Sequence, residues 1–101
     1  MKNITIGIAK ETESLTMKLG GRLDTTTAPE LEKAFEENMD VSKDLILDMK
    51  ELEYISSAGL RVLLAAQKKM NQSGKMKLTG VSDEVMEVFE ITGFSDILTI
   101  E

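Results

Sequence analysis

Two segments near the start of the chain alternate apolar and polar residues with a period of two. Residues 4–9 read ITIGIA and residues 15–20 read LTMKLG, so large apolar side chains recur at every second position. This period is typical of half-buried β-strands, whose successive side chains point to opposite faces of a sheet. The polar stretch KETE at 10–13 lies between them, and it predicts a hairpin that joins the two strands.

A helix is predicted after a polar, glycine-containing stretch. Residues 20–26, with the sequence GGRLDTT, have the composition of a loop. Thr27 is then a candidate N-cap, Pro29 suits the first turn, and Glu30 follows three residues after Thr27 as in a capping box. The residues that follow place apolar side chains on one face of this helix and acidic side chains on the others.

Two further helices alternate with short strands. The second helix is predicted from Ser57 to about Ser73, and the third from Ser82 to Gly93. A continuous apolar run at 45–47 suits a strand that is covered on both faces. Further strands are predicted at 76–78 and, at the edge of the sheet, at 97–100. The apolar positions expected to face inward from the helices are Ala28, Leu31, Phe35, Leu60, Leu63, Leu64, Val85, Val88 and Phe89, with Val62, Ala65 and Ala66 widening the face of the second.

The resulting order, β-β-α-β-α-β-α-β, predicts an α/β fold. The opening hairpin and the later βαβ units imply a mixed β-sheet with helices packed on it. The 101 residues fit one small domain, with no linker and no repeat, so the boundaries are expected at 1–101.

Composition excludes several classes of function. The chain has neither cysteine nor histidine, so disulfides, thiolate metal sites and histidine-based catalysis are excluded, and no cofactor is expected. Its formal net charge of −6 disfavours nucleic acid and anionic membranes as partners. It has no apolar run long enough for a signal peptide or a membrane span, so we expect a cytoplasmic protein without membrane insertion.

The segment 48–60, DMKELEYISSAGL, carries the strongest functional signal. A buried strand is expected to end there, followed by a short loop and a helix that begins at Ser56 and Ser57. A helix N-terminus presents free N–H groups and a partial positive charge, so it tolerates the roughly −1.5 to −2 charge of a phosphoserine. Ser57 is therefore a candidate phosphorylation site. The simpler interpretation is that Ser57 or Ser56 is only an N-cap, and the two roles are compatible.

Gly59 is unusual because it lies in the first turn of the predicted helix. Glycine in a helix costs roughly 1 kcal/mol relative to alanine, so some close contact should compensate. Two explanations remain open from the sequence: the backbone of a binding partner approaches Gly59, or the helix packs closely on the sheet of its own domain.

Three motifs resemble the STAS domain family, as found in bacterial anti-sigma-factor antagonists. YISSAGL at 54–60 is similar to the family's signature, in which an aromatic or aliphatic pair precedes Asp-Ser-Ser/Thr-Gly-Leu. GRLDTTTA at 21–28 resembles its Gly-x-Leu-Asp-x-x-Thr-Ala loop, and Gly93-Phe94 resembles the segment after its last long helix. The motifs occur in the family's order and span nearly the whole chain.

The resemblance implies a non-enzymatic switch. The family's phosphoacceptor falls on Ser57, and its acidic loop residue, which in relatives lies beside that serine and helps to bind the partner, falls on Asp24. The implied partner is an anti-sigma factor that is also an ATP-dependent serine kinase. The unphosphorylated antagonist binds this kinase and releases sigma, phosphorylation breaks the complex, and a serine phosphatase resets it.

The sequence departs from the family pattern at three positions. Ser56 replaces an Asp found in many phosphorylated members, Ala58 replaces a Ser or Thr, and Arg61 replaces a Gly. Ser56 is therefore the less favoured alternative acceptor. We hypothesise that Arg61, four residues after Ser57, pairs with phosphoserine 57 or with Asp24; the alternative is a solvated surface arginine. The expected partner-binding residues are Asp24, Thr25, Ser56, Ser57, Gly59 and Arg61.

Other functions receive less support from the sequence. A STAS subunit of a lipid-transport complex or a stress-sensing scaffold would fit the same motifs without phosphorylation. A small nucleotide hydrolase is disfavoured because no Walker motif and no metal cluster is present. Asp44 and Asp48 could mimic a metal-binding pair, but flanking a buried strand they suit strand-end polar groups better. The methionines Met39, Met70 and Met86 suit the core or its rim.

Overall fold

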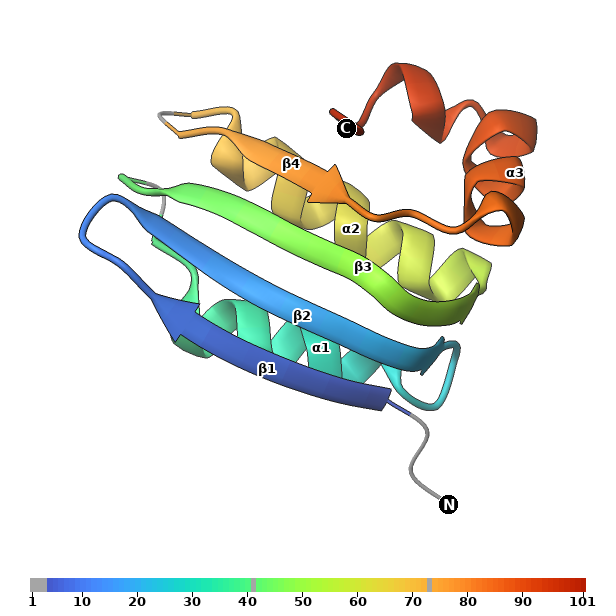
Figure 1. Cartoon of the computed structure of the whole chain (residues 1–101), viewed down its shortest axis with the longest axis horizontal. Helices are drawn as coiled ribbons and strands as arrows, with labels where there is room; N and C mark the ends of the chain where they lie inside the picture. The colour runs from blue at the N-terminus through green and yellow to red at the C-terminus, as the bar shows by residue number, and fades with distance from the viewer. Residues whose placement is uncertain (1–3, 41, 73) are drawn as a thin grey trace.

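The computed structural model describes residues 4–40, 42–72 and 74–101. Its elements follow one another as β1 (Ile4–Lys10), β2 (Ser14–Leu23), α1 (Ala28–Asn38), β3 (Asp44–Ile55), α2 (Ser57–Met70), β4 (Met76–Thr79) and α3 (Asp83–Thr92), and a 3₁₀ turn, η1 (Phe94–Asp96), follows (Figure 1). The strands form a four-stranded sheet in the order β1-β2-β3-β4. Since β1 pairs with β2 antiparallel and both β2/β3 and β3/β4 pair in parallel, the predicted mixed sheet with an opening hairpin is confirmed.

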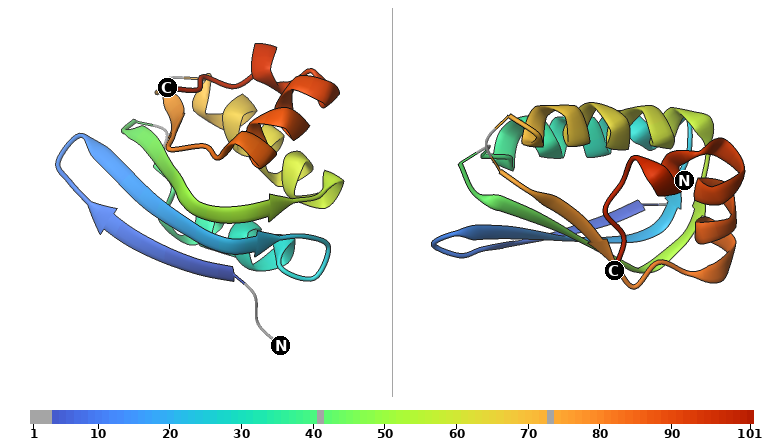
Figure 2. Two further views of the ribbon diagram at one scale, coloured as in Figure 1. Left: turned by 45° about the vertical axis from the view of Figure 1, so that its right-hand side comes forward. Right: turned by 90° about the horizontal axis from the view of Figure 1, so that it is seen from above.

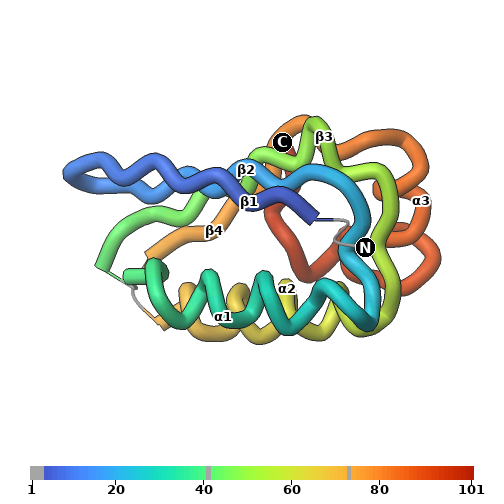
Figure 3. The backbone as a smooth tube through the Cα atoms, turned by 90° about the horizontal axis from the view of Figure 1, so that it is seen from below, coloured from blue at the N-terminus to red at the C-terminus, as the bar shows by residue number. Residues whose placement is uncertain are grey.

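The helices cover one face of the sheet. Figure 2 shows α1 and α2 side by side on the same face, whereas α3 stands at one end of the sheet. The tube in Figure 3 shows the same layers from below, with the tip of the β1–β2 hairpin reaching beyond α1. The buried apolar residues of β2, β3 and β4 face α1 and α2, so the core lies between the sheet and these two helices.

Both central strands are longer than the sequence predicted. Residues 20–23 were expected in a loop but complete β2, and β3 continues through the expected loop to Ile55. The register of β3 against β2 shifts twice, between Lys18 and Gly20 and between Gly21 and Arg22. At each shift β3 contains one extra residue, so its buried positions Met49, Leu52 and Ile55 are three apart rather than two. These bulges remove the period of two by which the strand could have been recognised.

The ends of two helices differ from the prediction. Thr27 occupies the N-cap position of α1, but its side chain makes no capping hydrogen bond. Its hydroxyl bonds the preceding loop instead, so the predicted N-cap position is confirmed but the expected side-chain cap is wrong. Helix α2 ends at Met70, three residues earlier than expected, and Ser73 lies outside the described residues. For α3, the Ser82 hydroxyl does accept a bond from the Val85 N–H at 3.2 Å, and Gly93 ends the helix in a left-handed conformation.

The expected edge strand at 97–100 is reduced to a single bridge. Ile100 lies in parallel register with Leu78 of β4. The Leu78 N–H donates to the Thr99 carbonyl at 2.8 Å, and the Glu101 N–H donates to the Leu78 carbonyl at 2.9 Å. The segment therefore covers part of the edge of β4 without forming a strand of its own.

The buried residues of the helices follow the predicted faces with few exceptions. Val88 and Leu64 are half-buried, and Ala65 is exposed. Gln67, which the sequence did not single out, is buried on the same face of α2 as Leu63 and Met70. Met70 is in the core and Met39 and Met86 pack at its margin, as expected.

Gly59 has an internal reason to be glycine. A Cβ atom at this position would lie 2.6 Å from the Cγ atom of Leu23 and 3.0 Å from the Cγ1 atom of Ile55. Both neighbours belong to the buried core, and Leu23 is fully buried. The sequence left two explanations for Gly59 open. The contacts with Leu23 and Ile55 support the second, close packing of α2 on the sheet of its own domain.

We predict that Gly59→Ala destabilises the domain. Overpacking a filled core costs about 1–3 kcal/mol, which outweighs the helix-propensity gain of roughly 1 kcal/mol. Gly7→Ala is the matched control, since a Cβ there would meet only the Lys18 Cβ atom at 3.7 Å, an ordinary contact. Urea unfolding measures both free energies of unfolding. Equal values for the two variants would contradict the packing explanation.

Candidate functional site

The site lies where β2 and β3 end together. The Ser56 N–H donates to the Leu23 carbonyl at 2.9 Å, and the Ser56 carbonyl accepts the first bond of α2 from the Leu60 N–H at 3.0 Å. Ser56 is the single residue between β3 and α2. Because the chain turns from strand to helix without a loop, the start of α2 is held directly beside the segment that follows Leu23.

The two serines differ in the accessibility of their hydroxyl groups. Ser57 is the first residue of α2 and is exposed, and its hydroxyl has no hydrogen-bond partner in the described part of the chain. Ser56 occupies the N-cap position, but its Oγ atom is buried, makes no capping bond and has no partner among the same residues. An enzyme could therefore reach the hydroxyl of Ser57 without moving the backbone, whereas that of Ser56 is enclosed.

Asp24 organises the loop between β2 and α1. Its Oδ1 atom accepts hydrogen bonds from the Thr26 hydroxyl at 2.8 Å, the Thr26 N–H at 3.0 Å and the Thr27 N–H at 3.2 Å. The Thr27 hydroxyl in turn donates to the Arg22 carbonyl at 2.8 Å and accepts from the Asp24 N–H at 2.8 Å. The hydrogen bond from the Thr26 hydroxyl is the main cause that lowers the pKa of the Asp24 carboxyl, because it stabilises the charged form.

Arg22 and Tyr54 complete the surface around this loop. They occupy paired positions of β2 and β3, and the Arg22 guanidinium carbon lies 4.1 Å from the centre of the Tyr54 ring. The Arg22 Nε atom lies 3.7 Å from the Asp24 Oδ2 atom. Both residues belong to the motifs noted in the sequence, but their contact could not be predicted because it depends on a register that the bulges of β3 set.

The other predicted site residues are distributed around this surface. Thr25 and Arg61 are exposed, and Gly59 is buried. Arg61 forms no ion pair with any described residue, and the cation beside Asp24 is Arg22. The predicted pairing of Arg61 with Asp24 is therefore not formed in this structure.

The acidic residues Asp44 and Asp48 lie outside this surface. Asp44 and Asp48 both lie in β3, and the Asp48 carboxylate accepts a bond from the Lys50 N–H at 3.1 Å, as suits a strand polar group. No group of three or more His, Cys, Asp or Glu side chains in the described ranges is arranged to hold a metal ion. In the same ranges, the helices are too short or too polar to cross a membrane.

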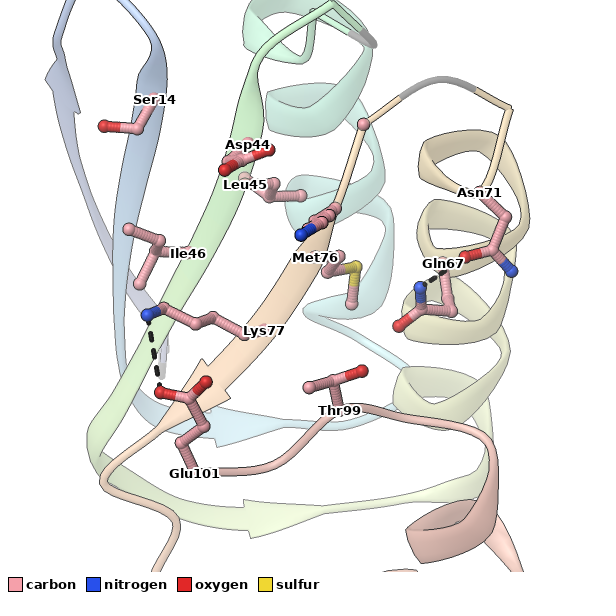
Figure 4. Close-up of a pocket in the computed structure, with 12 residues that line it drawn as sticks. Ser14, Asp44, Leu45, Ile46, Gln67, Asn71, Met76, Lys77, Thr99 and Glu101 are labelled. Atoms are coloured by element: carbon pink, nitrogen blue, oxygen red, sulfur yellow. Dashed lines mark hydrogen bonds and ion pairs between the residues drawn. The ribbon is translucent and has the colours of Figure 1, made fainter.

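A pocket at the opposite end of the sheet is lined by polar side chains, and the buried Oε1 atom of Gln67 has no hydrogen-bond partner among the described residues. It lies by the start of β3, β4 and the last turns of α2 (Figure 4). Lys77 pairs with Glu101 at 3.3 Å, and the Gln67 side-chain amide donates to the Asn71 Oδ1 atom at 2.9 Å. The pocket is thus remote from Ser57, which follows the carboxyl end of β3.

We predict that the charged carboxylate of Asp24 stabilises the folded domain at pH values above 3.8, the ordinary pKa of this group. This contribution to the free energy of unfolding is lost as pH falls through the lowered pKa of the folded state. Asp24→Asn keeps an acceptor oxygen but removes the charge. The difference in free energy of unfolding between wild type and Asp24→Asn should therefore be larger at neutral pH than at pH values below that range. A difference that does not change with pH would contradict a role for the charge.

Comparisons with known proteins identify the family of this chain. The model of the STAS domain matches residues 5–101. An anti-sigma-B factor antagonist from Listeria monocytogenes is 36% identical over 103 residues, which cover 98% of this chain and 90% of the relative.

Solved structures share the fold at lower identity. The crystal structure of an anti-sigma factor antagonist from Mycobacterium paratuberculosis superposes with a TM-score of 0.86 at 22% identity, covering 96% of this chain and 84% of the other. The Bacillus cell fate determinant SpoIIAA in its phosphorylated form superposes with a TM-score of 0.71 at 16% identity, covering 96% and 91%. The family model spans nearly the whole chain, including the loop that holds Asp24 and the start of α2, and the chain belongs to the STAS domain family.

Proposed function

We propose that this chain is a non-enzymatic anti-sigma-factor antagonist that is regulated by phosphorylation of Ser57. The observation that carries the proposal is the exposed hydroxyl of Ser57 at the start of α2, held beside the Asp24 loop by the Ser56–Leu23 hydrogen bond. The Listeria relative is named an anti-sigma-B factor antagonist, and SpoIIAA has been solved in a phosphorylated form. Both support the proposal.

The proposed partner is an anti-sigma factor that is also a serine kinase, acting in the cytoplasm. Asp24, Thr25, Ser56, Ser57 and Arg61 lie on or beside the surface that it would bind, and Gly59 allows α2 to begin close to Leu23. In the unphosphorylated state the partner packs against the bare hydroxyl of Ser57 and releases sigma. A serine phosphatase would return the phosphorylated chain to this state.

Phosphorylation would break the complex by changing charge rather than fold. A phosphoserine adds about −1.5 to −2 charges, and the N–H groups and partial positive charge of the helix N-terminus tolerate them. The partner surface, however, would have to desolvate this dianion on binding, which is costly without a matching cation. The domain is therefore expected to stay folded while the interface is lost.

We predict that phosphopeptide mass spectrometry of the protein from its own cells finds phosphate on Ser57 and that Ser57→Ala removes it. Ser56→Ala is the matched control and should leave the phosphate in place, because the buried Oγ atom of Ser56 is not accessible. Phosphate on Ser56 would keep the switch but contradict the assignment of the acceptor. Absence of phosphate under every growth and stress condition would sink the proposal and favour a transport subunit or a scaffold.

We predict that Arg61 stabilises the dianionic form of the phosphate. The second pKa of a phosphoserine is about 6, and a cation four residues along the helix should lower it. A ³¹P NMR titration of the phosphorylated chain measures this pKa, which should be higher in Arg61→Ala than in the wild type. The same titration with Lys68→Ala, which changes an exposed cation in the last turn of α2, should leave the pKa unchanged. Identical titrations for wild type and Arg61→Ala would assign Arg61 to the solvated surface.

A further inference from the structure

The side chain of Arg22 is held from two directions before any partner binds. Its guanidinium group lies over the Tyr54 ring at 4.1 Å, and its Nε atom faces the Asp24 Oδ2 atom at 3.7 Å. Asp24 is itself fixed through its other oxygen by Thr26 and Thr27. Arginine normally loses considerable side-chain entropy when it is ordered, so much of that cost is already met by the fold.

The remaining donors of Arg22 are unused. Its side chain is 49% exposed, and its terminal Nη groups form no hydrogen bond or ion pair with a residue in the described parts of the chain. The planar fork of an arginine matches the two oxygens of a carboxylate, which it can bind through two parallel bonds. Tyr54, 41% exposed, adds an aromatic surface beside this fork. Arg and Tyr are among the residue types that most often dominate the free energy of binding at protein interfaces.

The location of Arg22 connects it to the proposed switch. Arg22 and Leu23 pair with Tyr54 and Ile55 at the ends of β2 and β3, and the next residue, Ser56, is bonded to Leu23. Arg22 therefore lies on the same end of the sheet as Ser57. It is a cation on a chain whose formal net charge is −6, and its guanidinium group lies beside the carboxylate of Asp24. A carboxylate is the group complementary to this exposed cation, so Arg22 is suited to fix the orientation of a partner.

We propose that Arg22, positioned by Tyr54 and Asp24, binds an aspartate or glutamate side chain of the anti-sigma factor. This inference rests on the proposed function, since it names the chemistry by which the partner meets the surface beside Ser57. It makes Arg22 a determinant of partner specificity, with Tyr54 as a positioning residue.

The test measures binding of the purified chain to the purified anti-sigma factor kinase from the same organism by calorimetry. ADP replaces ATP, so that no phosphate is transferred. Arg22→Ala should weaken binding about tenfold or more, as expected for an interface anchor, and Arg22→Lys should recover only part of the loss. Lys18→Ala is the matched control, because it removes one exposed cation from the same strand and should bind as the wild type does.

A charge exchange identifies the carboxylate. Arg22→Glu should abolish binding, and replacing one Asp or Glu of the kinase by Lys should restore it. Urea unfolding of each variant checks that the domain remains folded. Wild-type affinity for Arg22→Ala, an equal loss for Lys18→Ala, or failure of every such replacement to restore binding would overturn the assignment of Arg22. Absence of binding by the wild type would instead refute the proposed antagonist function itself.

Discussion

The close approach of α2 to the end of β2 is the constraint on which the rest of the site depends. Gly59 leaves room for the side chain of Leu23, and the Ser56 N–H bonds the Leu23 carbonyl. Together these contacts join the end of β2, the end of β3 and the first turn of α2 into one unit. An exposed serine on that turn and an acidic loop after β2 are thereby brought to the same surface by the core, rather than by flexible segments.

Much of the architecture could be predicted because local patterns and tertiary structure agree. The strands at 4–9 and 15–20 have a period of two, and the caps of α3 are a serine and a glycine in their expected places. Prediction failed where one residue serves two elements. Thr27 is in a position to cap α1, but its hydroxyl is bonded to the Arg22 carbonyl and the Asp24 N–H, so the loop rather than the helix uses it.

The sequence indicated individual residues of the candidate site but not their arrangement. Ser57 and Asp24 stood out by motif, and their loop and helix are neighbours through the Ser56–Leu23 bond. The pairing of Arg22 with Tyr54 could not be read from the sequence, because two bulges in β3 shift which residues face each other across the strands. A register counted without those bulges would have placed Arg22 opposite a different residue.

The direct passage from β3 into α2 also affects how fast the proposed switch could respond. Hinge and lid motions occur on microsecond to millisecond timescales, and refolding of a segment can take longer. Only one residue separates strand β3 from helix α2, so no flexible loop at Ser57 is available for such motions. The two states would then differ in their electrostatic potential rather than in their shape. The time to change state would be set by the enzymes that add and remove the phosphate, and the domain itself would impose no delay.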